Sequence, residues 1–245
     1  MEIENHLKNY GYNLSFSLDD DLCSKELSKY LGKKKYFEFW SYVDNMREMF
    51  GPYQIENIIR DYIGNDEKFL KILLSGQIII SVSILKEIIK SIERDFKESN
   101  DKLNILELGG YDGWSSDYID LSINKSLSID IVDNSILEKK FNPNLKYIKS
   151  DYNLYNSDNK YDIIFSILGI EYVNIQSLIN CIDRNIKING CVYLGLRVQP
   201  DDYSKIIENF KELGFKEIEK DLKTIKVVKD TGVESFPLFE FKKIR

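Results

Sequence analysis

The stretch LNILELGGYDGW, residues 103–114, decides the fold, because an apolar run passes through a carboxylate into a glycine-rich turn. Residues 103–108 are typical of a buried strand, and the glycines Gly109, Gly110 and Gly113 follow at once. We expect Gly109 to allow a sharp bend, Gly110 to leave room for a ligand and Gly113 to let the next helix pack closely. The first strand-to-helix turn of a parallel α/β sheet is a common ligand site, so this turn is the first candidate.

Two carboxylates beside these glycines indicate the charge of the ligand. Residues 109–113 read G-G-Y-D-G, which lacks the G-x-G-x-x-G spacing that brings a pyrophosphate to a helix N-terminus. Glu107 at the strand end and Asp112 in the turn would repel a pyrophosphate and would suit a cationic ligand. The spacing therefore disfavours a nicotinamide-dependent oxidoreductase.

The chain beyond this turn alternates short apolar strands with helical stretches. Strands are predicted at 103–108, 126–132, 146–151, 161–168, 191–198, 216–221 and 237–244, and helices at 114–123, 175–186 and 201–215. Such alternation indicates a doubly wound, mostly parallel, Rossmann-like α/β sheet with helices on both faces. A loop without a helix separates the last two strands, so one of them is expected to run antiparallel near an edge. Gly190 and Gly214 are predicted to close the turns after the second and third helices.

The first part of the chain is dominated by helical periodicity instead. Apolar residues recur at steps of three and four in this part, and Ser81 or Ser83 is a plausible N-cap of its last helix. We therefore predict a helical N-terminal region over residues 1–100 and an α/β domain over residues 101–245. The helical region is expected to supply the acceptor site, a lid or a dimer contact.

Polar residues also stand at the ends of the later predicted strands. Asp130 lies toward the end of the second, where a carboxylate can accept hydrogen bonds from both hydroxyls of a ribose, and Asp133 competes for that role. Asp151 follows the third strand, where it could accept from the exocyclic amine of adenine with Tyr152 flanking the ring. Ser166 lies near the end of the fourth strand, next to the expected reactive centre.

This ordered series resembles the class I S-adenosylmethionine-dependent methyltransferases. ELGGYDG (107–113) looks like their first motif, YDIIFS (161–166) like their fourth-strand motif, and IEYV (170–173) like the stretch that follows it. The resemblance covers about residues 103–245 and implies a seven-stranded sheet with a reversed final strand. Tyr111 departs from the pattern, because the family usually has a glycine there. It either flanks the cofactor or marks a different path of the loop.

The resemblance implies S-adenosyl-L-methionine as cofactor and S-adenosyl-L-homocysteine as product. It implies that the cofactor contacts Glu107, Gly109, Gly110, Tyr111, Gly113, Asp130, Asp151, Tyr152 and Ser166. A helical region, then LLSGQIIISVSIL (73–85), then ILELGG (105–110) also resembles a group of bacterial sugar O-methyltransferases.

The sequence offers few catalytic bases. Glu171 follows the fourth strand and is expected near the acceptor if the resemblance holds, although a structural role is as good a reading. His6 is the one histidine and a weaker candidate, because a surface position is the default in a polar terminal segment. Tyr10, Tyr12 and Phe16 form a lid or simply pack together. No cluster of residues has the spacing of a metal site.

Composition limits the partners and the compartment. The net charge of −6 over 245 residues argues against nucleic acid and anionic membranes, which bind basic surfaces. Cys23, Cys181 and Cys191 are too few and too far apart for a disulfide framework or a zinc site. The longest apolar stretch, residues 78–85, is too short to span a bilayer. We expect a cytoplasmic protein, and the abundance of Ile, Lys and Asn suggests a bacterial source.

We therefore predict methyl transfer from S-adenosylmethionine to a small polar acceptor, such as an oxygen of a sugar or related metabolite. N-methylation of a metabolite or peptide is the alternative within enzymes. A non-catalytic module that binds S-adenosylmethionine is the alternative outside them. A homodimer is compatible with each of these readings.

Overall fold

The computed structural model describes residues 2–50, 62, 64, 66–134, 142–151, 154–167, 175–198, 200–219, 221–229 and 232–245. These residues pack as two compact units. The larger unit comprises the described residues of 81–226 and 235–245, and the smaller comprises those of 2–80 and 227–234. The units are defined by packing, and the functional domains that we predicted to meet near residue 100 stay a prediction.

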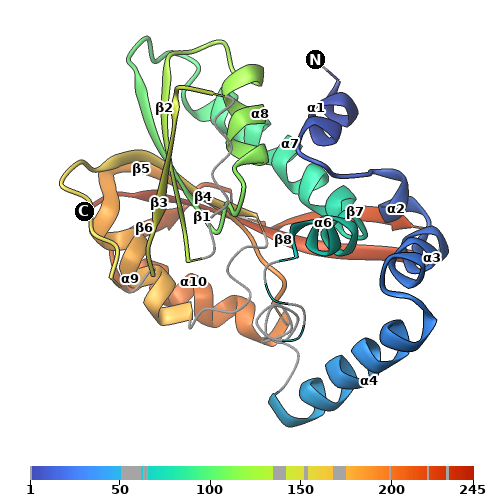
Figure 1. Ribbon diagram of the computed structural model, residues 1–245. Coiled ribbons are helices and arrows are strands. Elements are labelled where there is room, and N and C mark those ends of the chain that lie inside the picture. The colour runs from blue at the N-terminus through green and yellow to red at the C-terminus, as the bar shows by residue number, and fades with distance from the viewer. Residues whose placement is uncertain are drawn as a thin grey trace. The chain divides into compact units, whose positions relative to one another are not determined.

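A single sheet forms the centre of the larger unit (Figure 1). Its strands lie in the order β3-β2-β1-β4-β5-β8-β6, with β7 paired to β8 off this path. The first five strands run parallel, and β8 is antiparallel to β5 and β6. The strands are β1 Leu103–Leu108, β2 Leu127–Asp133, β3 Leu145–Lys149, β4 Tyr161–Ile167, β5 Ile186–Gly195, β6 Phe215–Glu217, β7 Lys223–Lys229 and β8 Gly232–Lys243. The predicted mostly parallel α/β sheet with an antiparallel strand near its edge is confirmed.

Helices cover both faces of this sheet. Leu106 of β1 and Val192 of β5 belong to one apolar cluster with Ile182 and Phe210 from the two helices on that face. On the other face, a Cβ at Gly195 would lie 2.5 Å from the Ile84 side chain, so β5 and the helix there are in close contact. The first face is covered by α9 Ile175–Asn185 and α10 Tyr203–Glu212, which follows the short 3₁₀ helix η2 Pro200–Asp202, and the other by α7 Ile78–Asp95 and α8 Trp114–Ser122 (Figure 1).

The order of strands places the predicted ligand turn at the switch point of the sheet. The chain builds β1, β2 and β3 toward one edge and then returns to add β4 on the other side of β1. The helices that follow β1 and β4 therefore lie on opposite faces of the sheet, and doubly wound sheets bind ligands at such a point. The turn after Leu108 opens there.

The smaller unit is mainly helical, as expected for most of the first hundred residues, and it also holds the end of β7 and the start of β8. Its helices are α1 Ile3–Asn9, α2 Ser15–Leu18, α3 Asp20–Leu31, α4 Lys33–Phe50 and α6 Glu67–Ser75. Leu27, Val43, Phe39 and Phe69 pack in its core, where the rings of Phe39 and Phe69 meet edge to face with centroids 5.2 Å apart. Among the described residues, no single helix is long and apolar enough to cross a membrane, and α6 and α7 meet that criterion only as a bent pair.

Three local predictions were wrong. The described sheet has eight strands rather than seven, because residues 223–229 form β7. Gly190 does not close a turn, since it lies inside β5, which already begins at Ile186. Neither Ser81 nor Ser83 caps a helix, because α7 begins at Ile78 and both serines fall within it.

Candidate functional site

The turn after β1 is shaped by three residues with positive φ: Gly109 at 80°, Tyr111 at 40° and Gly113 at 76°. The Gly109 N–H donates to the Val132 carbonyl at 2.9 Å, and the Gly113 N–H donates to the Gly110 carbonyl at 2.7 Å. The turn thus bends beside the end of β2 and passes into α8, for which Gly113 is the N-cap. Tyr111 therefore has a backbone conformation that residues other than glycine, asparagine and aspartate rarely adopt.

Close packing explains the glycines at 110 and 113. A Cβ at Gly110 would lie 2.6 Å from Ile131 Cγ2 and 2.7 Å from Glu107 Cδ. A Cβ at Gly113 would lie 2.7 Å from Ile131 Cδ1 and equally close to the Tyr147 hydroxyl. We expected Gly110 to leave room for a ligand, but Glu107 and Ile131 occupy the space above it. Gly110 instead allows the turn to fold over the Glu107 carboxyl group.

Glu107 is buried beneath this turn, with 2% of its surface exposed. The Ser116 hydroxyl donates to its carboxylate at 2.5 Å, and the Ser115 hydroxyl also donates to it. Burial raises the pKa of Glu107 to about 7, the two serines oppose the rise, and the charges of Asp112 and Asp133 add to it. The carboxyl group is therefore close to the point at which a nearby charge decides whether it is ionised.

The geometry separates the two acids that competed for the ribose. Asp133 is the last residue of β2, and its Oδ2 accepts a hydrogen bond from the Tyr111 N–H at 3.1 Å. Asp130 lies three residues deeper, where its Oδ2 accepts from the Tyr161 hydroxyl at 2.6 Å. The Tyr161 hydroxyl in turn lies 2.5 Å from that of Tyr155. Asp133 therefore lies at the carboxyl end of the strands, where a ligand is expected. Asp130 belongs to a polar cluster with Tyr155 and Tyr161.

Asp151 lies at the same carboxyl end of the sheet as Asp133. The Ser150 N–H donates to the Asp133 carbonyl at 3.3 Å, which brings the end of β3 beside the end of β2. Asp151 is half-buried, and its main-chain carbonyl accepts from the Tyr155 N–H at 2.9 Å. The glycine turn, Asp133 and Asp151 therefore follow consecutive strands at one end of the sheet.

Ser166 is brought to this end of the sheet but points into it. Its side chain is fully buried, and its hydroxyl donates to the Leu108 carbonyl at 2.7 Å. It thus supports the last residue of β1, directly before the glycine turn. Tyr152, Glu171 and the IEYV stretch at 170–173 lie outside the described residues.

In the helical unit, His6 and its neighbours are buried. His6 lies in α1 with 1% exposure, and its ring centroid is 5.1 Å from that of Tyr10, so the expected surface position was wrong. Tyr12 is also buried, and the Lys71 Nζ lies 3.9 Å above its ring. The geometry agrees with aromatic packing, while a catalytic role for His6 stays a prediction.

Cysteine chemistry is disfavoured by burial. Cys23, Cys181 and Cys191 are buried thiols. Burial raises the pKa of Cys181 and of Cys191 to about 11, so neither is a thiolate near neutral pH. Within the described part of the chain, no group of three or more His, Cys, Asp or Glu residues could hold a metal ion.

Sequence reasoning missed the side chains that support the site. Ser115 and Ser116 lie at the start of the predicted helix over residues 114–123, and their hydroxyls donate to Glu107, which was not predicted. The Tyr147 hydroxyl, from β3, donates to the Asp112 carbonyl at 3.1 Å and so holds the turn from above. The sequence could have indicated the two serines, because a buried carboxylate needs hydrogen-bond donors and their hydroxyls come directly after the glycine turn. No sequence feature indicated the contact of Tyr147, since it depends on the register of β3.

The fold is shared with solved structures of methyltransferases. The 1,6-didemethyltoxoflavin-N1-methyltransferase of Burkholderia thailandensis, solved with 1,6-didemethyltoxoflavin and S-adenosylhomocysteine, is 8% identical, with a TM-score of 0.56 over 79% of this chain and 91% of that one. A candidate S-adenosylmethionine-dependent methyltransferase of Listeria monocytogenes is 13% identical, with a TM-score of 0.52 over 67% and 100%. A candidate hemolysin of Lactococcus lactis is 12% identical, with a TM-score of 0.51 over 66% and 86%.

No protein-family model matches the sequence, and no curated protein sequence matches it either. At identities of 8–13%, the likeness to solved structures concerns the fold. The predicted resemblance to class I S-adenosylmethionine-dependent methyltransferases is confirmed at that level.

Proposed function

We propose that this protein binds S-adenosylmethionine at the turn after β1 and transfers its methyl group to a small polar acceptor. One observation carries the proposal: three carboxylates, Glu107, Asp112 and Asp133, gather at one glycine turn at the switch point of the sheet. Glu107 and Asp112 are 2% and 0% exposed, so little solvent screens their mutual repulsion. A cation lowers the free energy of such a cluster, whereas a pyrophosphate raises it.

The residues present fit the parts of this cofactor. Asp133 is suited to accept hydrogen bonds from the two ribose hydroxyls, because it is the last residue of β2. Asp151, after β3, is suited to the exocyclic amine of adenine. Glu107 and Asp112 supply negative charge toward the cationic methionine portion. When bound, the cofactor supplies a methyl group on a sulfonium centre, and the protein's part is to orient the acceptor and exclude water.

The acceptor that we propose is an oxygen of a sugar or related metabolite. This part of the proposal rests on the sequence resemblance to sugar O-methyltransferases and on the acidic net charge, which disfavours nucleic acids. Glu171 is our candidate for the base that an oxygen acceptor needs. The cytoplasmic location and the bacterial source stay predictions from composition.

Calorimetric titration tests the proposal. We expect S-adenosylmethionine and S-adenosylhomocysteine to bind and NAD not to bind. Binding of NAD alone, or of none of the three, would contradict the proposal. Methyl transfer to a panel of hydroxyl and amine acceptors then separates O-methylation from N-methylation. Tight cofactor binding with no transfer to any acceptor would favour a binding module.

A further inference from the structure

A groove runs between α7 and β7 in the larger unit, and its walls are unusually basic. Its volume is about 350 Å³, and it is lined by Ser83, Lys86, Glu87, Lys90, Lys223, Thr224, Ile225 and Lys226. Four lysines and one glutamate are among its lining residues, although the chain as a whole carries a net charge of −6. The groove is therefore basic, in contrast to the acidic net charge of the whole chain.

Part of this positive charge is not neutralised within the groove. Glu87 pairs with Lys90 at 2.6 Å and with Lys223 at 2.7 Å. Lys86 and Lys226 are exposed, and neither forms an ion pair with any residue that the structure describes. Lys86 projects from the helix on the groove side. Lys226 lies on the strand and alternates with Lys223 and the buried Ile225, so its ammonium group is on the opposite face of β7 from Glu87.

The strand side of the groove also offers main-chain hydrogen-bonding groups. β7 pairs with β8, and no other described strand pairs with β7. A free strand edge alternates N–H donors with carbonyl acceptors, which match the main chain of an extended peptide. A phosphate group has acceptors to offer but few donors, so the edge carbonyls would repel it. The lysines disfavour a second copy of β7, because like charges would face each other.

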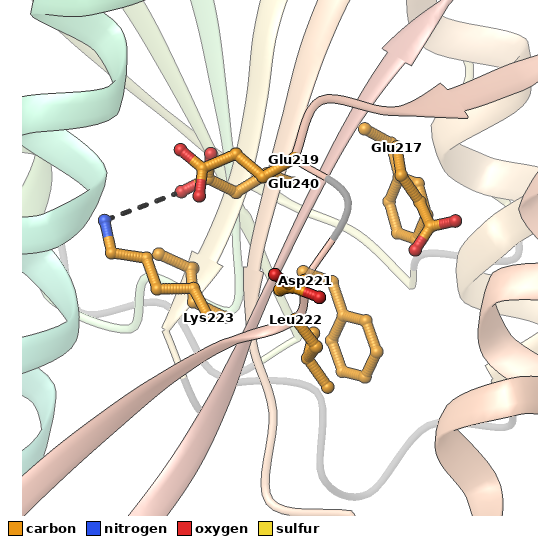
Figure 2. A pocket seen from close by; sticks show the side chains of 9 residues that line it. Glu217, Glu219, Asp221, Leu222, Lys223 and Glu240 are labelled. Atoms are coloured by element: carbon orange, nitrogen blue, oxygen red, sulfur yellow. Dashed lines mark ion pairs between the residues drawn. The ribbon is translucent and has the colours of Figure 1, made fainter.

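An acidic corner limits the groove beyond Lys223. Figure 2 shows Glu219, Asp221 and Glu240 near Lys223, whose Nζ lies 3.8 Å from a Glu240 carboxylate oxygen. The pocket at this corner has a volume of about 10 Å³, too small for a side chain. Arg94 pairs with Glu219 and Glu240 and so weakens their repulsion of an acidic ligand, but this corner offers no room for one. An acidic ligand is therefore expected beside Lys86, Lys90 and Lys226.

We propose that this groove binds an acidic segment of a partner protein, which adds to the free edge of β7 as an extended strand. Its main chain would pair with β7. Its carboxylates would contact Lys86 on the helix side of the added strand and Lys226 on the opposite side. The proposal is independent of the methyl-transfer activity, because it involves no residue of the glycine turn.

Fluorescence anisotropy with labelled peptides tests this proposal without any cofactor. The probe is acetyl-Glu-Val-Glu-Val-Glu-Val-Glu-amide, and the first comparison peptide has proline in place of each valine. The charge is equal, but proline cannot donate to a strand edge. We expect saturable binding of the probe that added salt weakens, and at least tenfold weaker binding of the proline peptide. Equal binding of the two peptides would overturn the proposal.

Two double variants locate the site. K86E/K226E reverses both free lysines of the groove, and K102E/K205E makes the same change of charge at exposed lysines elsewhere in the larger unit. The first is expected to weaken the probe at least tenfold and the second by less than about twofold, with circular dichroism confirming that both fold. Equal effects of the two variants, or tighter binding of a single-stranded oligonucleotide than of the probe, would overturn the proposal.

Discussion

Glu107 is the residue whose environment most constrains the site. Its pKa is raised from 4.5 to about 7, mainly by burial. A raised pKa favours the protonated form in the folded state, so this contribution to stability is fully present below pH 4.5 and is lost as the pH rises through 7. In the ligand-free protein, ionisation of Glu107 near neutral pH therefore lowers the free energy of unfolding relative to the protonated form.

A glutamine at this position removes the titration. We expect Glu107→Gln to be more stable than the wild type, by a margin that grows by about 2 kcal/mol between pH 5.5 and pH 8. Urea unfolding of both proteins at the two pH values measures the margin. Glu67→Gln, at an exposed helix position, is the control for loss of a carboxylate. A margin that stays constant or shrinks with pH would contradict the raised pKa.

Asp133 and Asp130 provide a second test at this scale. Asp133→Ala is expected to weaken binding of S-adenosylhomocysteine at least tenfold, which is about 1.4 kcal/mol, because the ribose loses its acceptor. Asp130→Ala should leave the affinity within about twofold but destabilise the fold by about 1–3 kcal/mol, because the buried Tyr161 hydroxyl loses its partner. Calorimetry and urea unfolding measure the two effects. If Asp130→Ala weakened binding and Asp133→Ala did not, Asp130 would be the residue that binds the ribose.

The residue types of the site could be predicted more readily than their roles. The charge of Glu107 and Asp112, and the need for glycine at 109 and 113, follow from the sequence. The choice between Asp130 and Asp133 does not, because it depends on where β2 ends and on which face each side chain lies. A shift of one residue along a strand exchanges the two faces. Tyr111 was equally ambiguous, and the structure gives its N–H to Asp133.

At the scale of elements, the contact between α7 and β5 depends on the absence of a side chain. A Cβ at Gly195 would lie 2.5 Å from Ile84 Cγ2, and Ile84 is fully buried. Gly195→Ala is expected to destabilise the protein by about 1–3 kcal/mol through overpacking. Ile84→Ala should cost about 2–5 kcal/mol through the cavity that it leaves.

The double variant tells whether the two changes act through one contact. Gly195→Ala with Ile84→Ala should cost less than the sum of the single changes, because the added methyl group enters the vacated space. Urea unfolding of the four proteins gives the coupling free energy. Additive effects would mean that α7 is held to the sheet elsewhere, for example by the Ser91 hydroxyl, which donates to Glu240 at 2.7 Å.

The strands were predictable where both faces are buried. β1 and β4 are mostly apolar and largely buried, and their limits agree with the sequence prediction to within one residue. β7 was missed although Ile225 and Val227 alternate with polar residues, because lysines at an edge strand resemble those of a loop. Gly190 was assigned to a turn for a similar reason. The neighbour with positive φ is Asn189, so the irregularity lies one residue earlier, inside β5.

At the scale of the whole molecule, the proposed function links proton release to cofactor binding. Glu107 has a pKa of about 7, and a bound cation would lower it by stabilising the ionised form. At pH 7, binding of S-adenosylmethionine should therefore release up to about half a proton, and the affinity should rise between about pH 6 and pH 8. S-adenosylhomocysteine lacks the sulfonium charge and should release fewer protons.

Calorimetric titration in two buffers with different ionisation enthalpies measures this release, because the apparent enthalpy then differs by the protons transferred. Glu107→Gln should release none, whatever its affinity, and Asp133→Ala serves as a control in which binding weakens while Glu107 still titrates. Release that persists in Glu107→Gln would assign the proton to another group. An affinity that falls as the pH rises would contradict a cationic ligand at this turn, and with it the reason for placing three carboxylates there.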